Sequence, residues 1–406
     1  MRRSLLPSLA LALLAPASLA AAESPAPAPA HAHGGKSAKG GDRSAQSELG
    51  AQAAFDAMGV LWAVHKVSGH IAVSRSEDRG RTWLNPVLVT PTPEPTDTGG
   101  DARPKIALGP ASEIYVTWTK PLAKPYTGEI KFARSLDGGR TFSAPFVVHR
   151  DRQEITHRFD ALAVSARGQV VVAWIDKRDL AAAVAAKAPP YRGAAIYFAL
   201  SDDRGGTFRD DTKLADHSCE CCRIALVPHA DGSLTALWRH IFAPNVRDHA
   251  LARISPTGQA GPVRRVSFED WKIDACPHHG PAVAEDSRQR LHAVWFSATP
   301  QNQGIFYSRL LADGAEARRR IGGDTAAHAD LAVLGERVAI AWKEFDGEKT
   351  RLRALLSSDG GDRWREVELA STPAASDHPR VLTSGDRFYV FWNTQAASRT
   401  VTLIPE

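Results

Sequence analysis

The chain has 406 residues, 43% of them hydrophobic, with a formal net charge of +5 and four cysteines. So small a charge on so long a chain gives no extended basic surface, and we expect no nucleic-acid partner. The length suggests either two ordinary domains or one domain built from repeats.

The N-terminus has the layout of a secretory signal peptide over residues 1–22. Arg2 and Arg3 precede an apolar run from Leu5 to Ala15, and small residues follow it. This run is about ten residues long, half of the roughly 20 that a spanning helix needs. No cysteine near the cleavage site supplies the thiol of a lipoprotein anchor. We therefore expect a periplasmic or secreted monomer without a transmembrane segment.

Residues 23–45 are rich in Pro, Ala, His and Gly, which predicts a flexible linker. After it, one pattern recurs to the end of the chain: a short strand, a polar turn, and an apolar strand ending near a tryptophan. Examples are IALGPASEIYVTW (residues 106–118) and VLTSGDRFYVFW (residues 381–392). The tryptophans recur every 50 to 60 residues or so, a spacing typical of propeller blades. They are Trp62, Trp118, Trp174, Trp238, Trp295, Trp342 and Trp392.

This repeat predicts an all-β fold over residues 46–406, a single β-propeller of four-stranded blades. Seven repeats are counted, with six blades as the alternative. The last repeat offers three strands, so an N-terminal strand is a candidate to complete it. An Ala-rich stretch from Leu180 to Tyr191 is expected to form a loop or short helix on the third blade.

Four segments share the pattern S-x-D-x-G-x-T-W: residues 76–83, 135–142, 201–208 and 357–364. In a tight turn the Asp carboxylate accepts backbone N–H groups, while glycine takes positive φ. We therefore interpret the aspartates of these Asp boxes as turn braces rather than catalysts. They are Asp78, Asp137, Asp203 and Asp359.

The Asp boxes, in register with the tryptophans, make the chain resemble the sialidase (BNR/Asp-box repeat) superfamily over nearly its whole length after Leu49. The C-x-C-C of residues 219–222 and the W-x-I-x-x-C-P-x-x-G-P of residues 271–281 are similar to those of bacterial sialidase-like proteins without a settled activity. The resemblance implies blades around a central channel, with Asp boxes away from the ligand site.

Propellers bind ligands at the channel mouth, near the starts of their innermost strands. The residues before each predicted inner strand are unusually polar, and we expect them to converge. The ligand-binding candidates are Arg103, His157, Arg158, Asp160, His328, Asp330, His378 and Arg380, and Asp101 and Asp377 belong to the same set.

All four cysteines fall in two adjacent repeats, which blades four and five would bring side by side. An oxidising compartment favours disulfides among Cys219, Cys221, Cys222 and Cys276, with three connectivities open. The alternative is a copper or zinc site, since thiolates and imidazoles suit both ions. Its candidate ligands are His217, Cys219, Cys221, Cys222, Cys276, His278 and His279.

The family's hydrolases bind a carboxylate with three arginines and use a tyrosine nucleophile and an acidic residue. The resemblance implies Arg103, Arg158 and Arg380 for the arginines, with Asp101 or Asp160 as the acid. Another glycosidase or lyase would use Asp101, Asp160, Asp330 or Asp377. None of the six tyrosines begins a predicted inner strand, so the nucleophile has no candidate.

These observations favour an exported propeller that binds a metal ion such as copper or zinc, or an anionic small molecule or glycan, at its channel mouth. Two alternatives stay open. One is a sialidase-like glycoside hydrolase acting on acidic sugars, and the other is a protein-interaction scaffold whose disulfides are structural.

Overall fold

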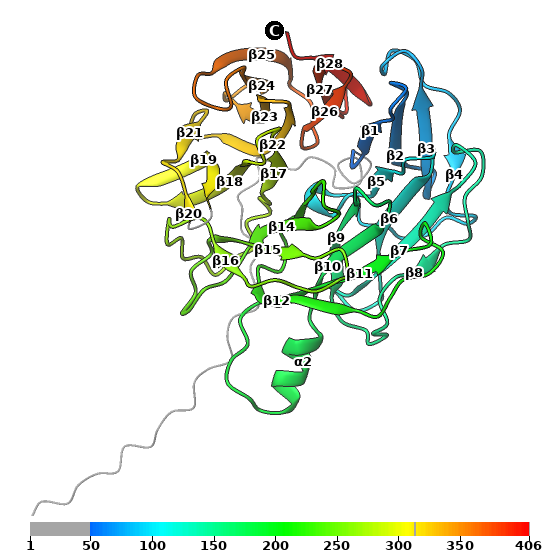
Figure 1. Cartoon of the computed structure of the whole chain (residues 1–406), viewed down its shortest axis with the longest axis vertical. Coiled ribbons are helices and arrows are strands. Elements are labelled where there is room, and N and C mark those ends of the chain that lie inside the picture. Colours follow the sequence, from blue (N-terminus) through cyan, green and yellow to red (C-terminus); the bar gives the residue numbers. More distant parts are fainter. Residues whose placement is uncertain (1–48, 312–313, 406) are drawn as a thin grey trace, which may run out of the picture. The chain divides into compact units, whose positions relative to one another are not determined.

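Seven antiparallel sheets form the blades of a seven-bladed β-propeller, as Figure 1 shows. The computed structural model describes residues 49–311 and 314–405, so the predicted signal peptide (1–22) and linker (23–45) lie outside the described residues. The prediction of seven blades is confirmed, and the alternative of six is wrong.

The first four blades have four strands each. Blade one consists of β1 (Gln52–Phe55), β2 (Leu61–Val67), β3 (His70–Ser76) and β4 (Val87–Leu88). Blade two follows a short 3-10 helix (Gly100–Ala102) and consists of β5 (Lys105–Leu108), β6 (Ile114–Pro121), β7 (Gly128–Ser135) and β8 (Phe146–Val147). Blade three consists of β9 (His157–Val164), β10 (Val170–Asp176), β11 (Ala194–Ser201) and β12 (Thr212–Ser218). Blade four consists of β13 (Ala225–Pro228), β14 (Leu234–Arg239), β15 (His249–Ile254) and β16 (Arg264–Arg265).

The last three blades differ in strand number. Blade five consists of β17 (Ala282–Glu285), β18 (Leu291–Thr299), β19 (Asn302–Leu311), β20 (Gly314–Ala315) and β21 (Arg319–Ile321), of which β20 and β21 both pair with β19. Blade six consists of β22 (Ala326–Leu334), β23 (Arg337–Phe345), β24 (Thr350–Ser357) and β25 (Arg365–Thr372). Blade seven consists of β26 (Arg380–Ser384), β27 (Arg387–Trp392) and β28 (Thr400–Leu403).

The first strand of each blade lies at the centre of the ring. Each of β1, β5, β9, β13, β17, β22 and β26 contacts the next, and β26 contacts β1. Figure 1 shows the same succession as a run of colours from blue to red, with the last blade beside the first. The two ends of the described chain therefore close the ring.

The closure does not use a shared strand within the described residues, where blade seven keeps three. Instead, the Asn393 amide donates to the Leu49 carbonyl at 2.5 Å, and the Ala51 N–H donates to the Asp377 carboxylate at 3.3 Å. Arg103 pairs with Asp377 at 2.9 Å and donates to the Ala51 carbonyl at 3.1 Å. We call these five residues the closure latch. It replaces the strand sharing that the sequence suggested.

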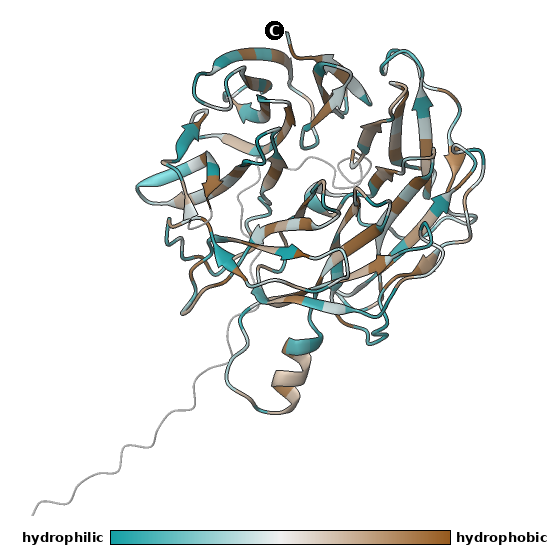
Figure 2. Ribbon diagram, viewed as in Figure 1, coloured by the Kyte–Doolittle hydropathy of each residue, from teal (hydrophilic) through white to brown (hydrophobic). Residues whose placement is uncertain are grey.

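All seven repeat tryptophans are buried and lie in the second strand of their blades. A second strand is flanked within its sheet and covered by blades on both faces, so a continuous apolar run suits it. The strand β10, Val170–Asp176, is buried at every residue. Figure 2 shows the same hydrophobic colouring along the inner strands of the blades. The tryptophans thus form the packing layer between blades.

The Asp boxes form the turns between the third and fourth strands of blades one, two, three and six. In blade three, the Ser201 hydroxyl donates to Asp203 at 2.7 Å, and the Thr207 N–H and hydroxyl both donate to it at 2.9 Å. The backbone N–H of Thr207, followed by the hydroxyls, lowers the pKa of Asp203 to about 2. Phe208, the final aromatic, packs 5.0 Å from Phe132 of the preceding blade. The turn-brace interpretation is confirmed.

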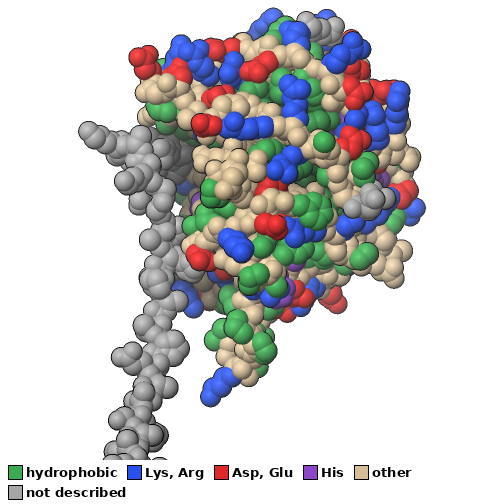
Figure 3. All heavy atoms as spheres, turned by 90° about the vertical axis from the view of Figure 1, so that its left-hand side faces the viewer, with side chains coloured by type: hydrophobic (Ala, Val, Ile, Leu, Met, Phe, Trp, Pro, Cys, Tyr) green, Lys and Arg blue, Asp and Glu red, His purple; other side chains and the backbone are tan. Residues whose placement is uncertain are grey.

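The Ala-rich insertion on blade three forms α2 (Arg178–Ala185) and a loop, between β10 and β11. Within the described part of the chain, no helix combines the length and the apolar character that crossing a membrane requires. Figure 3 shows basic and acidic side chains interspersed over the face that it presents, which agrees with the small net charge.

Candidate functional site

The direction of the strands decides which connections share a face of the ring. Because successive strands are antiparallel, the connection before each first strand and the connection between strands two and three reach the same face. We call this the mouth face. It carries α2 and the predicted polar residues, whereas the Asp boxes lie on the opposite face, as the resemblance implied.

The four cysteines meet on the mouth face. Cys219, Cys221 and Cys222 lie between β12 and β13, and Cys276 lies in the connection before β17. The Sγ of Cys219 is 3.9 Å from that of Cys221 and 3.5 Å from that of Cys222, while Cys276 contacts Cys221. Blades four and five therefore bring both segments side by side, as predicted. We call these four residues the cysteine cluster.

The sulfur distances distinguish the two interpretations of the cluster. A disulfide bond holds its sulfurs about 2.0 Å apart, whereas all four cysteines here are free thiols. The disulfides expected from an oxidising compartment are therefore not formed in the structure. Four sulfurs placed tetrahedrally about 2.3 Å from a zinc ion lie about 3.8 Å apart. The separations of 3.5 and 3.9 Å among Cys219, Cys221 and Cys222 match this second arrangement, and Cys276 lies beside these three residues.

Three of the four cysteines are buried, Cys276 is half-buried, and two guanidinium groups stand beside the cluster. Cys219, Cys221 and Cys222 are at most 3% exposed. The Arg247 Nη1 lies 3.6 Å from the Cys219 Sγ, and Arg239 is the other nearby cation. Hydrogen bonding from the neighbouring thiols, and then these two cations, hold the pKa of Cys219 well below its usual value. Neither arginine stood out in the sequence, because nothing local marks a β-strand arginine as a neighbour of thiols.

The predicted histidine ligands lie beside the cluster rather than in it. Among the described residues, the group whose ligand atoms come together for a metal consists of Cys219, Cys221 and Cys222. His217 lies against the Tyr191 ring at 4.7 Å, and His278 is exposed, 6.3 Å from the Phe159 ring. His279 stacks on Phe296 at 4.1 Å.

His279 begins a column of stacked imidazoles on the mouth face. The rings of His279 and His328 are 4.3 Å apart, and those of His328 and His378 are 3.5 Å apart, each pair nearly parallel. Burial lowers the pKa of His279 to about 4, that of His378 to about 3, and that of His328 well below its usual value. The column is therefore neutral near pH 7, and it joins blades five, six and seven.

Asp101 ties the two cysteine segments together. Its carboxylate accepts the N–H of Arg223, next to Cys222, at 3.2 Å, and the N–H of Gly280, four residues after Cys276, at 2.9 Å. The Arg223 guanidinium, 3.6 Å from the same carboxylate, donates to the carbonyls of Gly280, Pro281 and Ala329. The mouth of the ring is thus held by a network that spans blades two, four, five and six.

The other candidate acids also brace neighbouring blades. Asp160 accepts the Thr117 hydroxyl at 2.5 Å and the Thr119 hydroxyl at 3.3 Å. Asp330 accepts the Val381 N–H at 2.8 Å and pairs with Arg380 at 3.1 Å. Asp377 belongs to the closure latch. These acids are buried and already bonded, so each has a structural partner.

The three arginines implied by the resemblance are separated by their partners. Arg103 belongs to the closure latch, and Arg158 pairs with Asp97 at 2.6 Å. His157 is fully buried, stacked on His149 at 3.9 Å and 3.4 Å from Asp151. Of the three arginines implied by the resemblance, Arg380 is the one that lines the central channel. The tyrosines lie in second or third strands or in loops, as predicted: Tyr115, Tyr126, Tyr191, Tyr197, Tyr307 and Tyr389.

The central channel contains a small cavity of about 120 Å³. All seven inner strands or the residues just before them contribute to it, and its charged lining consists of Lys105, Arg223, Asp330 and Arg380. Burial lowers the pKa of Lys105 to about 8, and its ammonium donates to the carbonyls of Asp101 and Arg103. Neither Lys105 nor Arg223 stood out in the sequence, because no local pattern marks a lysine of an inner strand or an arginine after the cysteines as part of the channel lining.

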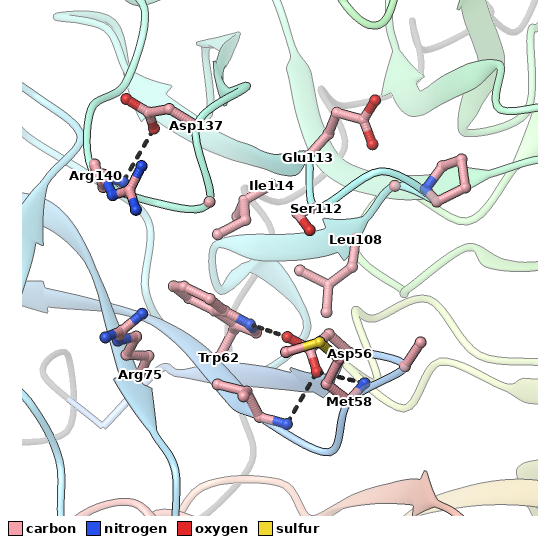
Figure 4. Close-up of a pocket in the computed structure, with 15 residues that line it drawn as sticks. Asp56, Met58, Trp62, Arg75, Leu108, Ser112, Glu113, Ile114, Asp137 and Arg140 are labelled. Carbon is pink, nitrogen blue, oxygen red and sulfur yellow. Dashed lines mark hydrogen bonds between the residues drawn. The ribbon is translucent and has the colours of Figure 1, made fainter.

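A larger pocket, of about 490 Å³, lies between blades one and two on the Asp-box face (Figure 4). Its polar groups are mostly committed to turns. Asp56 accepts the N–H groups of Met58 and Val60 at 2.9 Å each and the indole N–H of Trp62 at 3.0 Å. Asp137 is the brace of an Asp box. The residues that line this pocket include no cysteine and no histidine, in contrast to the mouth face.

Known proteins resemble this chain in fold but not in sequence. No protein-family model and no curated protein matches the sequence. A PL25 ulvan lyase structure has a TM-score of 0.57 at 8% identity, over 88% of this chain and 92% of that chain. Polysaccharide lyase Uly1 has a TM-score of 0.50 at 9% identity, over 85% and 87%. A Hadza microbial sialidase has a TM-score of 0.49 at 11% identity, over 84% and 76%.

The protein is therefore a seven-bladed β-propeller structurally similar to a PL25 ulvan lyase. At these identities the likeness concerns the fold alone, because unrelated activities occur on one fold. The features of this chain that bear on its function are the cysteine cluster and the channel.

Proposed function

We propose that this protein is an exported, metal-binding propeller whose cysteine cluster holds a zinc or copper ion. The observation that carries the proposal is the meeting of four free cysteines from two blades, with buried sulfurs 3.5 and 3.9 Å apart. Thiolates at this spacing are the ligand set that both ions prefer.

The donor set also indicates the role of the ion. Four protein ligands close a tetrahedral site and leave no position for water or substrate, as in structural zinc sites. Cys219, Cys221, Cys222 and Cys276 would hold the ion, and the ion would join the connections of blades four and five. Asp101 would keep both connections in place through the N–H groups of Arg223 and Gly280. We therefore propose that the ion has a structural or storage role rather than a catalytic one.

The first test is the metal content of the full chain, purified from its exported location without chelator. We expect about one equivalent of metal per chain and no titratable thiols until the metal is removed. Chelation should then lower the melting temperature, because the ion binds the folded state only. A metal-free protein with four titratable thiols, unable to take up zinc or copper(I), would contradict the proposal.

A second candidate function is the binding or cleavage of acidic sugars at the channel. The specific observation is the channel cavity, where Lys105, Arg223 and Arg380 outnumber Asp330, so that the lining has a net positive charge that suits a carboxylate. One of the similar structures is described as a PL25 ulvan lyase bound to -[GlcA(1-4)Rha3S]-. Calorimetric titration with glucuronate and sialic acid tests it. If this candidate is right, heat of binding should appear and should fall at least about tenfold in affinity with Arg380→Met.

A further inference from the structure

Arg239 is a buried cation without an anionic amino-acid partner among the described residues. The residue is 1% exposed, and its guanidinium donates to the carbonyls of Arg247, His279 and Phe296. It also lies 4.7 Å from the Trp271 ring, and its Nε has no hydrogen-bond partner. A guanidinium removed from water costs several kcal/mol unless a negative charge compensates it. Its side chain therefore requires an anion nearby.

Arg247 is half-buried, and it too has no ion pair with a carboxylate among the described residues. Its Nη1 contacts the Cys219 Sγ at 3.6 Å, and its Nε donates to the Asn245 amide oxygen at 3.2 Å. Neither of these two partners of Arg247 is a carboxylate. Glu220 acts on Cys276, but it is paired with Lys177 at 2.6 Å, so this pair adds no net charge. The cysteine cluster is left with two uncompensated guanidinium groups.

The charges select the kind of ion. Four thiolates carry four negative charges, and Arg239 and Arg247 supply two positive ones. One divalent ion brings this largely buried assembly to zero, whereas a single copper(I) ion leaves one negative charge. Because an uncompensated buried charge is expensive, the neutral assembly is favoured.

We propose that Arg239 and Arg247 are the counter-ions of a tetrathiolate centre built for one divalent ion of the zinc class. This inference rests on the proposed metal-binding function and adds to it the valence of the ion and two positioning residues. It also accounts for a buried arginine that has only neutral contacts.

The experiment compares zinc affinity in the full chain and in three variants, with cobalt(II) as the spectroscopic probe of four thiolate ligands. Arg247→Gln removes one counter-ion at a half-buried position. Arg247→Lys keeps the charge. Arg253→Gln is the matched control, because Arg253 lies on β15 of the same blade and pairs with Asp231 on the Asp-box face.

We expect one zinc or cobalt(II) ion per wild-type chain. Arg247→Gln should lower zinc affinity by about 10- to 100-fold, the effect typical of losing an outer-shell partner. Arg247→Lys should recover most of that loss, which a purely structural role of the guanidinium would not produce. Arg253→Gln should bind like the wild type.

The outcomes separate the two proposals. Zinc binding that Arg247→Gln leaves unchanged would overturn the counter-ion inference and leave the metal site standing. Retention of copper(I), with no zinc or cobalt(II) taken up, would overturn the divalent assignment alone. A wild-type chain that binds no metal would overturn both.

Discussion

Cys221→Ser is expected to lower zinc affinity by more than about 100-fold and to remove the chelator-sensitive part of the melting temperature. Cys221 lies 3.9 Å from Cys219 and contacts Cys276, so its sulfur joins the two cysteine segments. Serine keeps the size of the side chain and loses the soft donor. The measurements are zinc competition against a chromophoric chelator and thermal unfolding with and without chelator.

Ser218→Ala is the control for this prediction. Ser218 is buried and next to Cys219, and its hydroxyl donates to the Cys219 carbonyl at 3.0 Å, but it offers no sulfur. It should change the melting temperature slightly and leave zinc affinity within a few-fold of the wild type. If Cys221→Ser bound zinc as tightly as Ser218→Ala, the cluster would not be the metal site.

Arg103→Met is expected to lower the free energy of unfolding by about 3–5 kcal/mol, the cost of breaking a buried ion pair from one side. The side chains of Arg103 and Asp377 are 4% and 3% exposed and pair at 2.9 Å. Without Arg103, Asp377 keeps a buried carboxyl whose pKa burial already raises. The closure latch would lose its ion pair and the hydrogen bond to the Ala51 carbonyl. Urea unfolding at neutral pH measures the effect.

Two further variants make the test of the closure latch specific. Arg387→Met, at a half-exposed arginine on β27 of blade seven, should cost less than about 1 kcal/mol. The double variant Arg103→Met, Asp377→Leu should lose less than the sum of the single changes, because neither buried charge is then left alone. A cost for Arg103→Met no larger than for Arg387→Met would show that the latch does not hold the ring together.

The proposal that the protein binds or cleaves acidic sugars rests on the side chains of the channel, and no longer on the resemblance to sialidases. Of the three arginines that the resemblance implied, Arg103 and Arg158 are tied to Asp377 and Asp97, and only Arg380 reaches the cavity. The candidate acids brace neighbouring blades. A sialidase-like reaction would need these groups released, whereas a channel that only binds a carboxylate would need Arg380 and its two cationic neighbours.

The sequence by itself determined the architecture and the meeting of the cysteines. Seven tryptophans and four Asp boxes are short-range signals, because each recurs at a fixed place in a strand–turn–strand pattern that is visible within one hairpin. Their order along the chain is enough to predict blades, faces and the adjacency of Cys221 and Cys276.

Only the tertiary structure decided which polar side chains already have a hydrogen-bond or ion-pair partner, and which residue that partner is. Arg103 pairs with Asp377, and Asp101 bonds to Gly280, across distances in sequence that no local pattern encodes. Arg239 and Arg247 belong to strand and loop segments of ordinary appearance, and only burial beside thiols gives them a role. The physical reason is that hairpins are specified by neighbours in sequence, whereas the charge balance of a buried site depends on every blade that surrounds it.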